Sequence, residues 1–305
     1  MAKSKKFGTF TGVFTPSILT ILGVIMYLRM GWVVGNAGLL STIIIILIAH
    51  VISITTGLSI SSIATDKKVG AGGVYYVLSR SLGLPIGGAL GLTLFAAMAL
   101  SIALYMVGFA EIFNQWIGFG YETVNGVKTP IEGALTNSYR ITGSLGLLTL
   151  TILALISTSI ALKTQFIILA LILVSLFSIF LGSSDNLITT VASPISETVG
   201  FFAIFAIFFP AVTGFTAGVS MSGDLKDPKK SIPFGTMLSI GTGLIIYIVL
   251  AIFISLSIDE DILINNPNAL FQFAAVNILV FIGVWGATLS SALGGILGGP
   301  RILQA

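Results

Sequence analysis

Long runs of apolar residues separated by short polar segments are the main pattern along this chain. A helix needs about 20 apolar residues to cross the hydrocarbon core of a membrane, and most of these runs approach or exceed that length. The eight runs cover residues 11–34, 39–63, 86–116, 141–162, 166–181, 200–222, 234–258 and 271–299. A transmembrane β-barrel would instead need segments of about 10 residues with alternating hydrophobicity, which runs such as 41–48 lack. The pattern predicts an all-α membrane protein with eight transmembrane helices.

The composition agrees with a membrane protein and excludes several other classes. Of the 305 residues, 55% are hydrophobic and only 8% are charged, whereas soluble domains carry about 25% charged residues. There is no cysteine, which excludes disulfide scaffolds and thiolate metal sites. The net charge of +3 is too small and too scattered to suggest nucleic-acid binding. With one histidine and few charges inside the spans, catalytic candidates are almost absent, so neither an enzyme nor a cofactor is expected.

Basic residues fall mostly on one side of the predicted spans. If the N-terminus is cytoplasmic, the outer loops hold only Lys128 and Arg140. The inner side then holds Lys3, Lys5, Lys6, Lys67, Lys68, Arg80, Lys163, Lys226, Lys229, Lys230 and Arg301. The outer acidic residues are Glu122, Glu132, Asp185, Glu197, Asp259, Glu260 and Asp261, and the inner ones are Asp66, Asp224 and Asp227. This asymmetry follows the positive-inside rule and predicts a multi-pass protein of the cell membrane with both termini in the cytoplasm.

Two charged residues remain inside the spans, Arg29 in the first and Glu111 in the third. Charges at membrane depth are costly and usually functional, and each needs a partner. Both lie near the outer ends of their spans, so we expect them to pair and to close an outer entrance. The alternative is that each side chain reaches the outer interface separately. His50 has no nearby acidic residue, and we interpret it as a packed residue rather than as a proton relay.

The first and sixth spans contain residues that interrupt helices. The first contains Gly23, and the sixth contains Pro210 and Gly214. Proline removes a backbone donor, and non-helical backbone inside a membrane is tolerated where it lines a cavity. Such a break exposes N–H groups that suit an anion and carbonyl groups that suit a hard cation. The alternative is that these residues only kink the helices or allow close packing.

Several segments resemble the cation–chloride cotransporter family, in the correct order along the whole chain. They are GVIMYLRMGWVVGNAG (23–38), ISSIAT (60–65), GGVYYVLSRSLG (72–83), YMVGFAE (105–111), FPAVTG (209–214), SGDLKDP (222–228) and LSSAL (289–293). The segment 72–83 alone would also fit the wider amino acid–polyamine–organocation superfamily. The combination is specific to the cotransporters, and the short loop 117–140 is typical of prokaryotic members.

The resemblance implies a LeuT-type fold, in which two inverted five-helix repeats contain discontinuous first and sixth spans. Residues 1–182 would form the first repeat, and residues 183–305 an incomplete second repeat of three spans. Because the chain stops at Ala305, we expect a truncated transmembrane domain of about eight helices without the family's cytoplasmic C-terminal domain. Members of the family commonly form homodimers, in part through that domain, so a homodimer is an open expectation.

The resemblance also implies ion sites, which we assign residue by residue. Chloride would bind the backbone N–H groups of Gly23, Val24 and Ile25 and those of Gly214, Phe215 and Thr216. Potassium would bind oxygens of Thr20, Ile21, Tyr105, Pro210 and Thr213. Sodium would bind the carbonyls of Leu19, Leu22 and Ala287 and the hydroxyls of Ser290 and Ser291. Arg29 and Glu111 fall on the family's extracellular gate positions.

Individual residues refine these expectations. Potassium–chloride members lack the second serine of the pair Ser290–Ser291, and sodium–chloride members typically have histidine at Tyr105, so both features favour a carrier of Na⁺, K⁺ and Cl⁻. The alternative for these residues is ordinary helix packing. The family usually has asparagine and tryptophan where this chain has Thr20 and Leu22, which puts the shape of the potassium site in doubt. Arg29 and Glu111 each lie six residues beyond a site residue, about 9 Å outward at 1.5 Å per residue.

The sequence therefore predicts a secondary active transporter that carries Cl⁻ with Na⁺ and K⁺ in electroneutral symport by alternating access. Its partners would be the lipid bilayer and inorganic ions. The nearest alternative is an H⁺- or Na⁺-coupled amino-acid permease of the same superfamily. Those permeases bind the substrate carboxylate at a break of small residues, whereas this chain has bulkier residues at 21–25. A membrane receptor or a channel is a more distant alternative.

Overall fold

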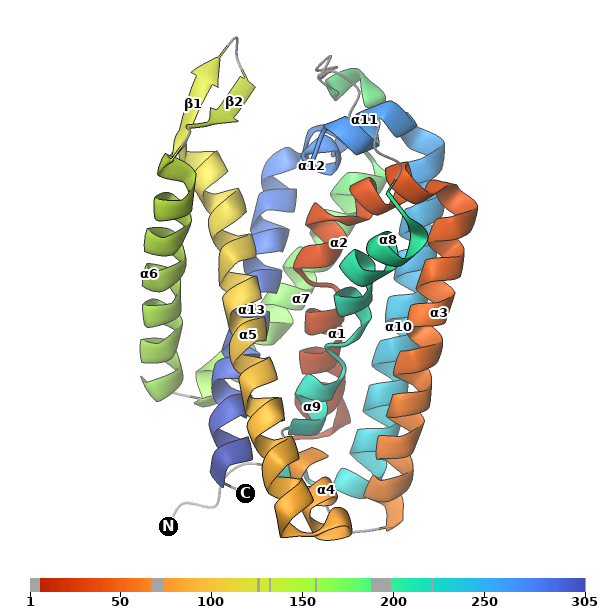
Figure 1. The fold of residues 1–305 in the computed structure, drawn as a ribbon, viewed down its shortest axis with the longest axis vertical. Helices are drawn as coiled ribbons and strands as arrows, with labels where there is room; N and C mark the ends of the chain where they lie inside the picture. Colours follow the sequence, from red (N-terminus) through yellow and green to blue (C-terminus); the bar gives the residue numbers. More distant parts are fainter. Residues whose placement is uncertain are drawn as a thin grey trace.

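The computed structural model of the chain describes residues 6–66, 74–124, 127–131, 133–156, 158–187, 199–220 and 222–304. These residues form helices and one two-stranded hairpin (Figure 1). The elements are η1 (Phe10–Phe14), α1 (Thr15–Ile21), α2 (Val24–Leu28), α3 (Met30–Asp66), α4 (Val74–Leu82), α5 (Leu84–Ile117), β1 (Tyr121–Val124), β2 (Val127–Pro130), α6 (Ala134–Ile156), α7 (Thr158–Phe180), η2 (Ser184–Asn186), α8 (Phe201–Phe208), η3 (Phe209–Val212), α9 (Thr216–Ser220), η4 (Ser222–Asp224), α10 (Pro228–Ser257), α11 (Glu260–Asn265), α12 (Ala269–Phe273) and α13 (Asn277–Gln304).

Six helical segments among the described residues are long and apolar enough to cross a membrane. They are Phe10–Leu28, Met30–Asp66, Pro85–Ile117, Ala134–Ile156, Pro228–Ser257 and Asn277–Leu303. Two shorter apolar helices, Thr164–Phe180 and Phe201–Val212, coincide with the fifth and sixth predicted spans. The fold is therefore mostly helical, with six candidate spans, and the count of eight stays a prediction. The division into repeats at residues 182 and 183 also stays a prediction.

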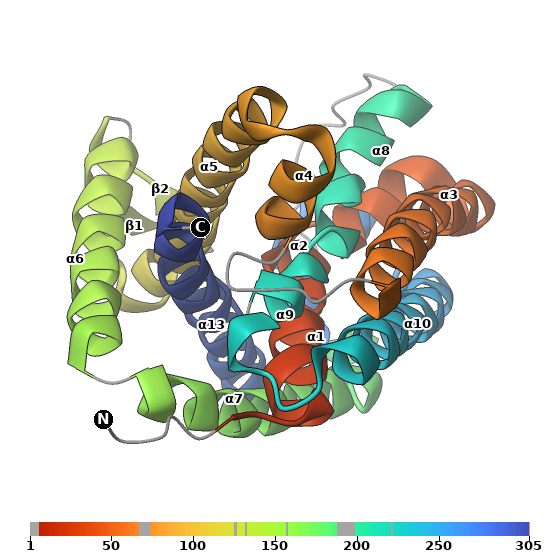
Figure 2. The same cartoon turned by 90° about the horizontal axis from the view of Figure 1, so that it is seen from below.

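The first predicted span lies at the centre of the molecule. Figures 1 and 2 show α1 and α2 enclosed by α3, α5, α7, α10 and α13. In the segment Phe10–Leu28 the most apolar stretch is 78% buried, compared with 11% for that of Ala134–Ile156. A helix that is apolar on all sides is stable when it is surrounded by others, so the central position of this span follows from its composition.

Helix boundaries differ from the predicted ones in four places. The first two spans are joined in α3, where Gly38 (φ 69°, ψ 167°) interrupts the helical backbone. Arg140 was assigned to an outer loop and Lys163 to an inner loop, but they lie within α6 and α7. A helix continues through polar residues as long as its backbone hydrogen bonds continue. Hydropathy, which detects only apolar residues, therefore misplaces the first turns of α6 and α7. The eighth span begins at Asn277 rather than at residue 271, because α12 is a separate short helix.

The hairpin β1–β2 is a departure from the all-α prediction. It pairs antiparallel with Tyr121 opposite Pro130 and stands at the same end of the molecule as α11 (Figure 1). Asn-Gly, the dipeptide at 125–126, is a strong sequence signal for a hairpin that hydropathy does not detect. The helices α4, α11 and α12 were also not predicted.

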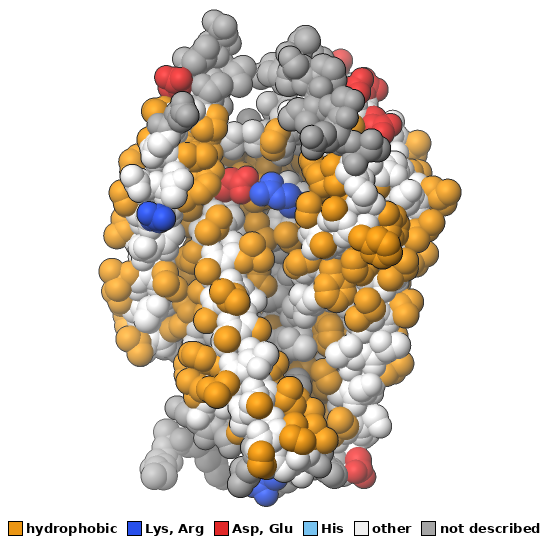
Figure 3. All heavy atoms as spheres, in the orientation of Figure 1, with side chains coloured by type: hydrophobic (Ala, Val, Ile, Leu, Met, Phe, Trp, Pro, Cys, Tyr) orange, Lys and Arg blue, Asp and Glu red, His pale blue; other side chains and the backbone are white. Residues whose placement is uncertain are grey.

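Charged side chains of the described residues gather mainly at the two ends (Figure 3). Glu122 in β1 and the acidic residues of 259–261 belong to the hairpin end, whereas α4 and the end of α13 lie at the opposite end (Figure 1). The latter end also holds residues near both termini, because the Phe7 N–H donates to the Asp224 carbonyl at 2.8 Å and Arg301 pairs with the Asp224 carboxylate. Some predicted loop charges lie outside the described residues, namely Lys3, Lys5, Lys67, Lys68, Glu132 and Glu197, as do residues 72–73 of the motif 72–83.

Close packing of α9 on α1 gives a test of the central arrangement. A Cβ atom on Gly218 would meet the Val13 carbonyl oxygen and would lie 2.7 Å from the Ser17 Oγ. We therefore expect Gly218→Ala to reduce stability by about 1–3 kcal/mol, as overpacking does, measured as a lower melting temperature in detergent. The control is Gly241→Ala in α10, where a Cβ would meet nothing within 4 Å. Equal melting temperatures for the two variants would contradict the packing of α9 against α1.

Candidate functional site

The first break lies between α1 and α2. The backbone leaves the helix at Leu22 (φ −82°, ψ 45°) and Gly23 (φ −92°, ψ −158°), and α2 begins at Val24. Gly23 has a negative φ, so glycine is not needed here to adopt a left-handed backbone conformation. A Cβ at Gly23 would lie 2.8 Å from the Thr20 carbonyl oxygen. The position therefore needs glycine for space.

The second break lies between η3 and α9. Pro210 is in η3, residues 213–215 are not helical, and the helix resumes at Thr216. A Cβ at Gly214 would lie 2.6 Å from the Thr20 Oγ1. The absence of a side chain at Gly214 thus lets the two breaks approach each other at Thr20.

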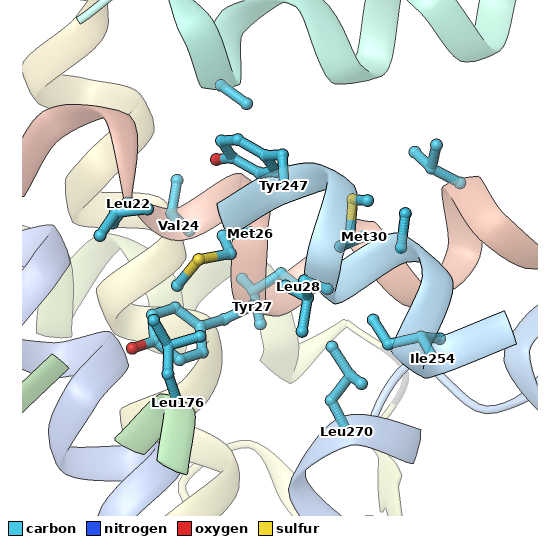
Figure 4. Packing of buried hydrophobic residues seen from close by; sticks show 14 of the residues in the cluster. Leu22, Val24, Met26, Tyr27, Leu28, Met30, Leu176, Tyr247, Ile254 and Leu270 are labelled. Atoms are coloured by element: carbon cyan, nitrogen blue, oxygen red, sulfur yellow. The ribbon is translucent and has the colours of Figure 1, made fainter. Parts of the chain in front are cut away.

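Hydroxyl groups from surrounding helices bind carbonyls at and beside both breaks. The Thr20 Oγ1 lies closest to the Gly214 carbonyl oxygen, at 2.6 Å, while the Ser17 and Pro16 carbonyl oxygens of its own helix lie at 2.8 Å and 3.1 Å. Ser17 Oγ donates to Phe215 at 2.7 Å, Ser53 Oγ to Val212 at 2.8 Å, and the Tyr247 hydroxyl to Ile21 at 2.7 Å. Figure 4 shows the Tyr247 ring beside Leu22 and Val24, with its oxygen turned toward them. Ser17, Ser53 and Tyr247 are not among the site residues that the sequence predicts. The only sequence feature that marks these three residues is an isolated hydroxyl group within an apolar span.

One cavity of about 40 Å³ lies between the two breaks, and we call it the central cavity. Its lining residues are Thr20, Ile21, Gly23, Val24, Ile25, Ser101, Leu104, Tyr105, Pro210, Ala211 and Thr213. They include all five residues assigned to potassium and the first three assigned to chloride. A single water molecule needs roughly 10–15 Å³, so the central cavity has the size for one or a few small ions or waters. Ser101, one turn before Tyr105, was missed by the sequence analysis.

The other predicted ligands lie elsewhere. Gly214, Phe215 and Thr216 are not among the residues that line the central cavity. The five residues assigned to sodium lie on α1, at its C-cap and on α13, two helices that pack together, and Leu19, Leu22, Ala287, Ser290 and Ser291 are all buried. The Ser290 and Ser291 hydroxyls have no hydrogen-bond partner among the described residues.

Arg29 and Glu111 form an ion pair, which we call the outer pair. The Arg29 Nη2 lies 3.4 Å from the Glu111 Oε2, and the two side chains are 40% and 26% exposed. At this distance and exposure the pair contributes little to stability, about 0–1 kcal/mol. Tyr121, at the start of β1, has a raised pKa. Burial raises it, the hydrogen bond to Tyr139 lowers it, and the negative charge of Glu111 raises it. The hydroxyls of Tyr121 and Tyr139 lie 2.8 Å apart.

A second ion pair lies at the opposite end, and we call it the inner pair. The Arg301 Nη1 lies 2.8 Å from the Asp224 Oδ2, which joins the end of α13 to the segment after α9. His50 belongs to neither end. It is buried, its Nδ1 lies 2.9 Å from the Ile46 carbonyl oxygen, and its ring packs near Tyr247. These contacts agree with the interpretation of a packed histidine.

The six long apolar helical segments indicate a multi-pass membrane protein. Comparison with known families agrees, since the family described as "Amino acid permease" matches residues 12–305. The chain belongs to this family.

The similar proteins include members of solute carrier family 12. Member 1 from Mus musculus is 33% identical over 359 residues, covering 98% of this chain and 32% of the relative. Member 8 from Mus musculus is 32% identical over 300 residues (98% and 42%), and member 2 from Homo sapiens is 31% identical over 358 residues (98% and 28%). The resemblance to cation–chloride cotransporters is therefore confirmed. The chain spans about a third of the length of the first of these relatives.

The hydroxyl of Thr20 offers a test of how the two breaks are held together. We expect Thr20→Val to reduce stability by about 1–2 kcal/mol, because the half-buried Gly214 carbonyl loses the hydroxyl donor 2.6 Å away. Thermal unfolding in detergent measures the change. The matched control is Thr55→Val, because Thr55 is exposed and bonds only within its own helix; it should cost less than about 0.5 kcal/mol. If Thr20→Val is as stable as the control, the hydrogen bond does not hold the breaks together.

Proposed function

We propose that this protein is a secondary active transporter that carries Cl⁻ with Na⁺ and K⁺ in electroneutral symport by alternating access. The central cavity is the observation that carries the proposal. The central cavity is lined by ligands assigned to two oppositely charged ions. The potassium ligands lie on α1, α5 and η3, and the chloride ligands lie at the start of α2. The membership of the family and the relatives in solute carrier family 12 support it.

The chemistry of the central cavity suits a pair of ions. Potassium would bind the Tyr105 hydroxyl and oxygens near the end of α1 and in η3. The Ile21 carbonyl already accepts a hydrogen bond from Tyr247, but a carbonyl oxygen has two lone pairs, so a cation can share it. Chloride would bind the N–H groups at Gly23, Val24 and Ile25, because the first turn of a helix leaves its N–H groups without intrahelical acceptors. The two ions would compensate each other's charge.

A second chloride would bind the N–H groups of Gly214, Phe215 and Thr216, where α9 begins. Sodium would bind between α1 and α13, at the carbonyls of Leu19, Leu22 and Ala287 and the hydroxyls of Ser290 and Ser291. The two serine hydroxyls support this site, because both are buried without a partner among the described residues. A buried hydroxyl that lacks a partner is costly, and a cation would supply one. A LeuT-type inverted-repeat arrangement would place the backbone ligands at the two discontinuous helices, with α5 and α13 supplying the remaining groups.

The outer pair would close the extracellular entrance, with both termini in the cytoplasm of a cell-membrane protein. The hairpin end carries acidic residues, and the opposite end carries Lys226, Lys229, Lys230 and Arg301, which supports this orientation. The weak and partly exposed contact between Arg29 and Glu111 suits a gate, because a gate must open at little cost.

An amino-acid permease is the second candidate, favoured by the family description. The size of the central cavity is the argument against it. Pockets for organic ligands usually measure about 300–1,000 Å³, whereas this one measures about 40 Å³. The bulky residues Ile21, Leu22 and Val24 at the first break also leave less room for a carboxylate and its side chain.

Ion dependence of uptake tests the proposed function directly. The purified protein is reconstituted in liposomes, and Rb⁺ uptake is measured with Na⁺ or Cl⁻ removed one at a time. We expect each removal to abolish uptake, since symport requires all the ions, and a pH gradient or added amino acids to leave it unchanged. Uptake that does not depend on chloride would refute the cotransporter and favour the permease.

Mutation of the outer pair tests the gate. We expect Glu111→Gln to change the rate of Rb⁺ uptake from the outer side several-fold without a change in melting temperature, because the pair acts on opening and contributes little to stability. The exchanged double variant, Arg29→Glu with Glu111→Arg, should restore part of the wild-type rate. A gate role is excluded if Glu111→Gln transports at the wild-type rate and with the wild-type pH dependence.

A further inference from the structure

A second cavity of about 20 Å³ lies next to the central cavity, and we call it the inner cavity. Its lining includes Thr20, Gln165, Ser290 and Arg301. Thr20 lines both cavities and therefore separates them. Arg301 belongs to the inner pair, so the inner cavity lies between the sodium ligands and the end of the molecule that carries Asp224.

Gln165 is the polar residue that the proposed sites leave unexplained. It lies in α7 and is 3% exposed, and its Oε1 has no hydrogen-bond donor among the described residues. The Ser290 Oγ, from α13, is in the same situation and lines the same cavity. Two buried oxygen atoms without partners at one small cavity are costly unless a ligand binds them.

The ligand that fits is a small cation. Carbonyl and hydroxyl oxygens are the groups that hard cations prefer, and the volume excludes an organic molecule. The charge of Arg301 does not oppose a cation fully, because its guanidinium is paired with the Asp224 carboxylate at 2.8 Å. Two cation ligands already assigned line this cavity, Ser290 in the proposed sodium site and Thr20 in the proposed potassium site.

We propose that the Gln165 Oε1 is a sodium ligand, supplied by α7, that acts together with the Ser290 hydroxyl on the inner side of the sodium site. This inference rests on the proposed function, in which the protein couples transport to sodium. Gln165 then holds Na⁺ as it moves between the site on α1 and α13 and the end of the molecule at the inner pair. Loss of the Gln165 oxygen weakens sodium binding directly. It leaves the chloride ligands intact, because the chloride N–H groups lie at the two breaks.

Sodium binding by the purified protein in detergent tests this role separately from transport. The probe is ²²Na⁺ at a fixed Cl⁻ concentration, and parallel samples without Na⁺ are titrated with ³⁶Cl⁻, because coupled ions change each other's affinity reciprocally. We expect Gln165→Met, which keeps the volume and removes the oxygen, to bind Na⁺ about tenfold more weakly, the effect of about 1.4 kcal/mol, with unchanged Cl⁻ affinity. Gln165→Glu keeps an oxygen and adds a negative charge, so it should bind Na⁺ more tightly than the wild type at pH 8.

The control is Ser175→Ala, which removes another buried hydroxyl from the same helix, one that lies beside the Tyr27 hydroxyl and does not line the inner cavity. Its Na⁺ affinity should equal that of the wild type. The proposal is overturned by an unchanged Na⁺ affinity in Gln165→Met, by an equal loss in Ser175→Ala, or by a loss of Cl⁻ affinity of the same size. If Gln165→Met does not fold, unchanged Na⁺ affinity in Gln165→Glu overturns it. A wild-type protein that transports Rb⁺ with Cl⁻ but binds no Na⁺ would refute this inference and leave chloride-coupled transport standing.

Discussion

The hydrogen bond from the Thr20 hydroxyl to the Gly214 carbonyl is the contact on which the arrangement of the two breaks depends. Inside a membrane no bulk water can satisfy the backbone groups that a broken helix frees. Here hydroxyls of α1, α3 and α10 satisfy carbonyls at and beside the breaks, so the breaks face each other instead of kinking separately. Gly23 and Gly214 allow this close approach, because a Cβ atom at either position would lie within 3 Å of Thr20, and Gly23 also lines the central cavity.

The charges of the protein are separated from this centre. The two ion pairs recorded among the described residues lie toward opposite ends, Arg29 with Glu111 and Arg301 with Asp224. The central cavity itself is lined by backbone, hydroxyl and apolar groups without a charged side chain. The low content of charged residues, 8%, therefore reflects the lipid surroundings. It also extends to the interior, because the central cavity, where ions are proposed to bind, is lined by uncharged residues.

Hydropathy predicted most of the fold because long apolar helices need little tertiary information. It failed where helices have polar ends, at Arg140, and where a hairpin or a short helix depends on local turns. The residues at the breaks could be predicted because proline, glycine and a family motif mark them. Tyr247, Ser53 and Gln165 could not, because their roles depend on which distant backbone or cavity each side chain reaches, and a single hydroxyl or amide in an apolar span carries no such information.

Binding by uncharged ligands also suggests how transport is coupled in the proposed mechanism. A fixed carboxylate would hold a cation whether or not chloride is present, whereas carbonyls and hydroxyls provide only partial charges. Two monovalent ions about 5 Å apart attract each other by about 3 kcal/mol at an effective dielectric constant of 20, more than a hundredfold in affinity. Each ion would thus bind weakly alone and tightly with its counterion. The shortage of charge at the breaks becomes the reason that cation and anion move together.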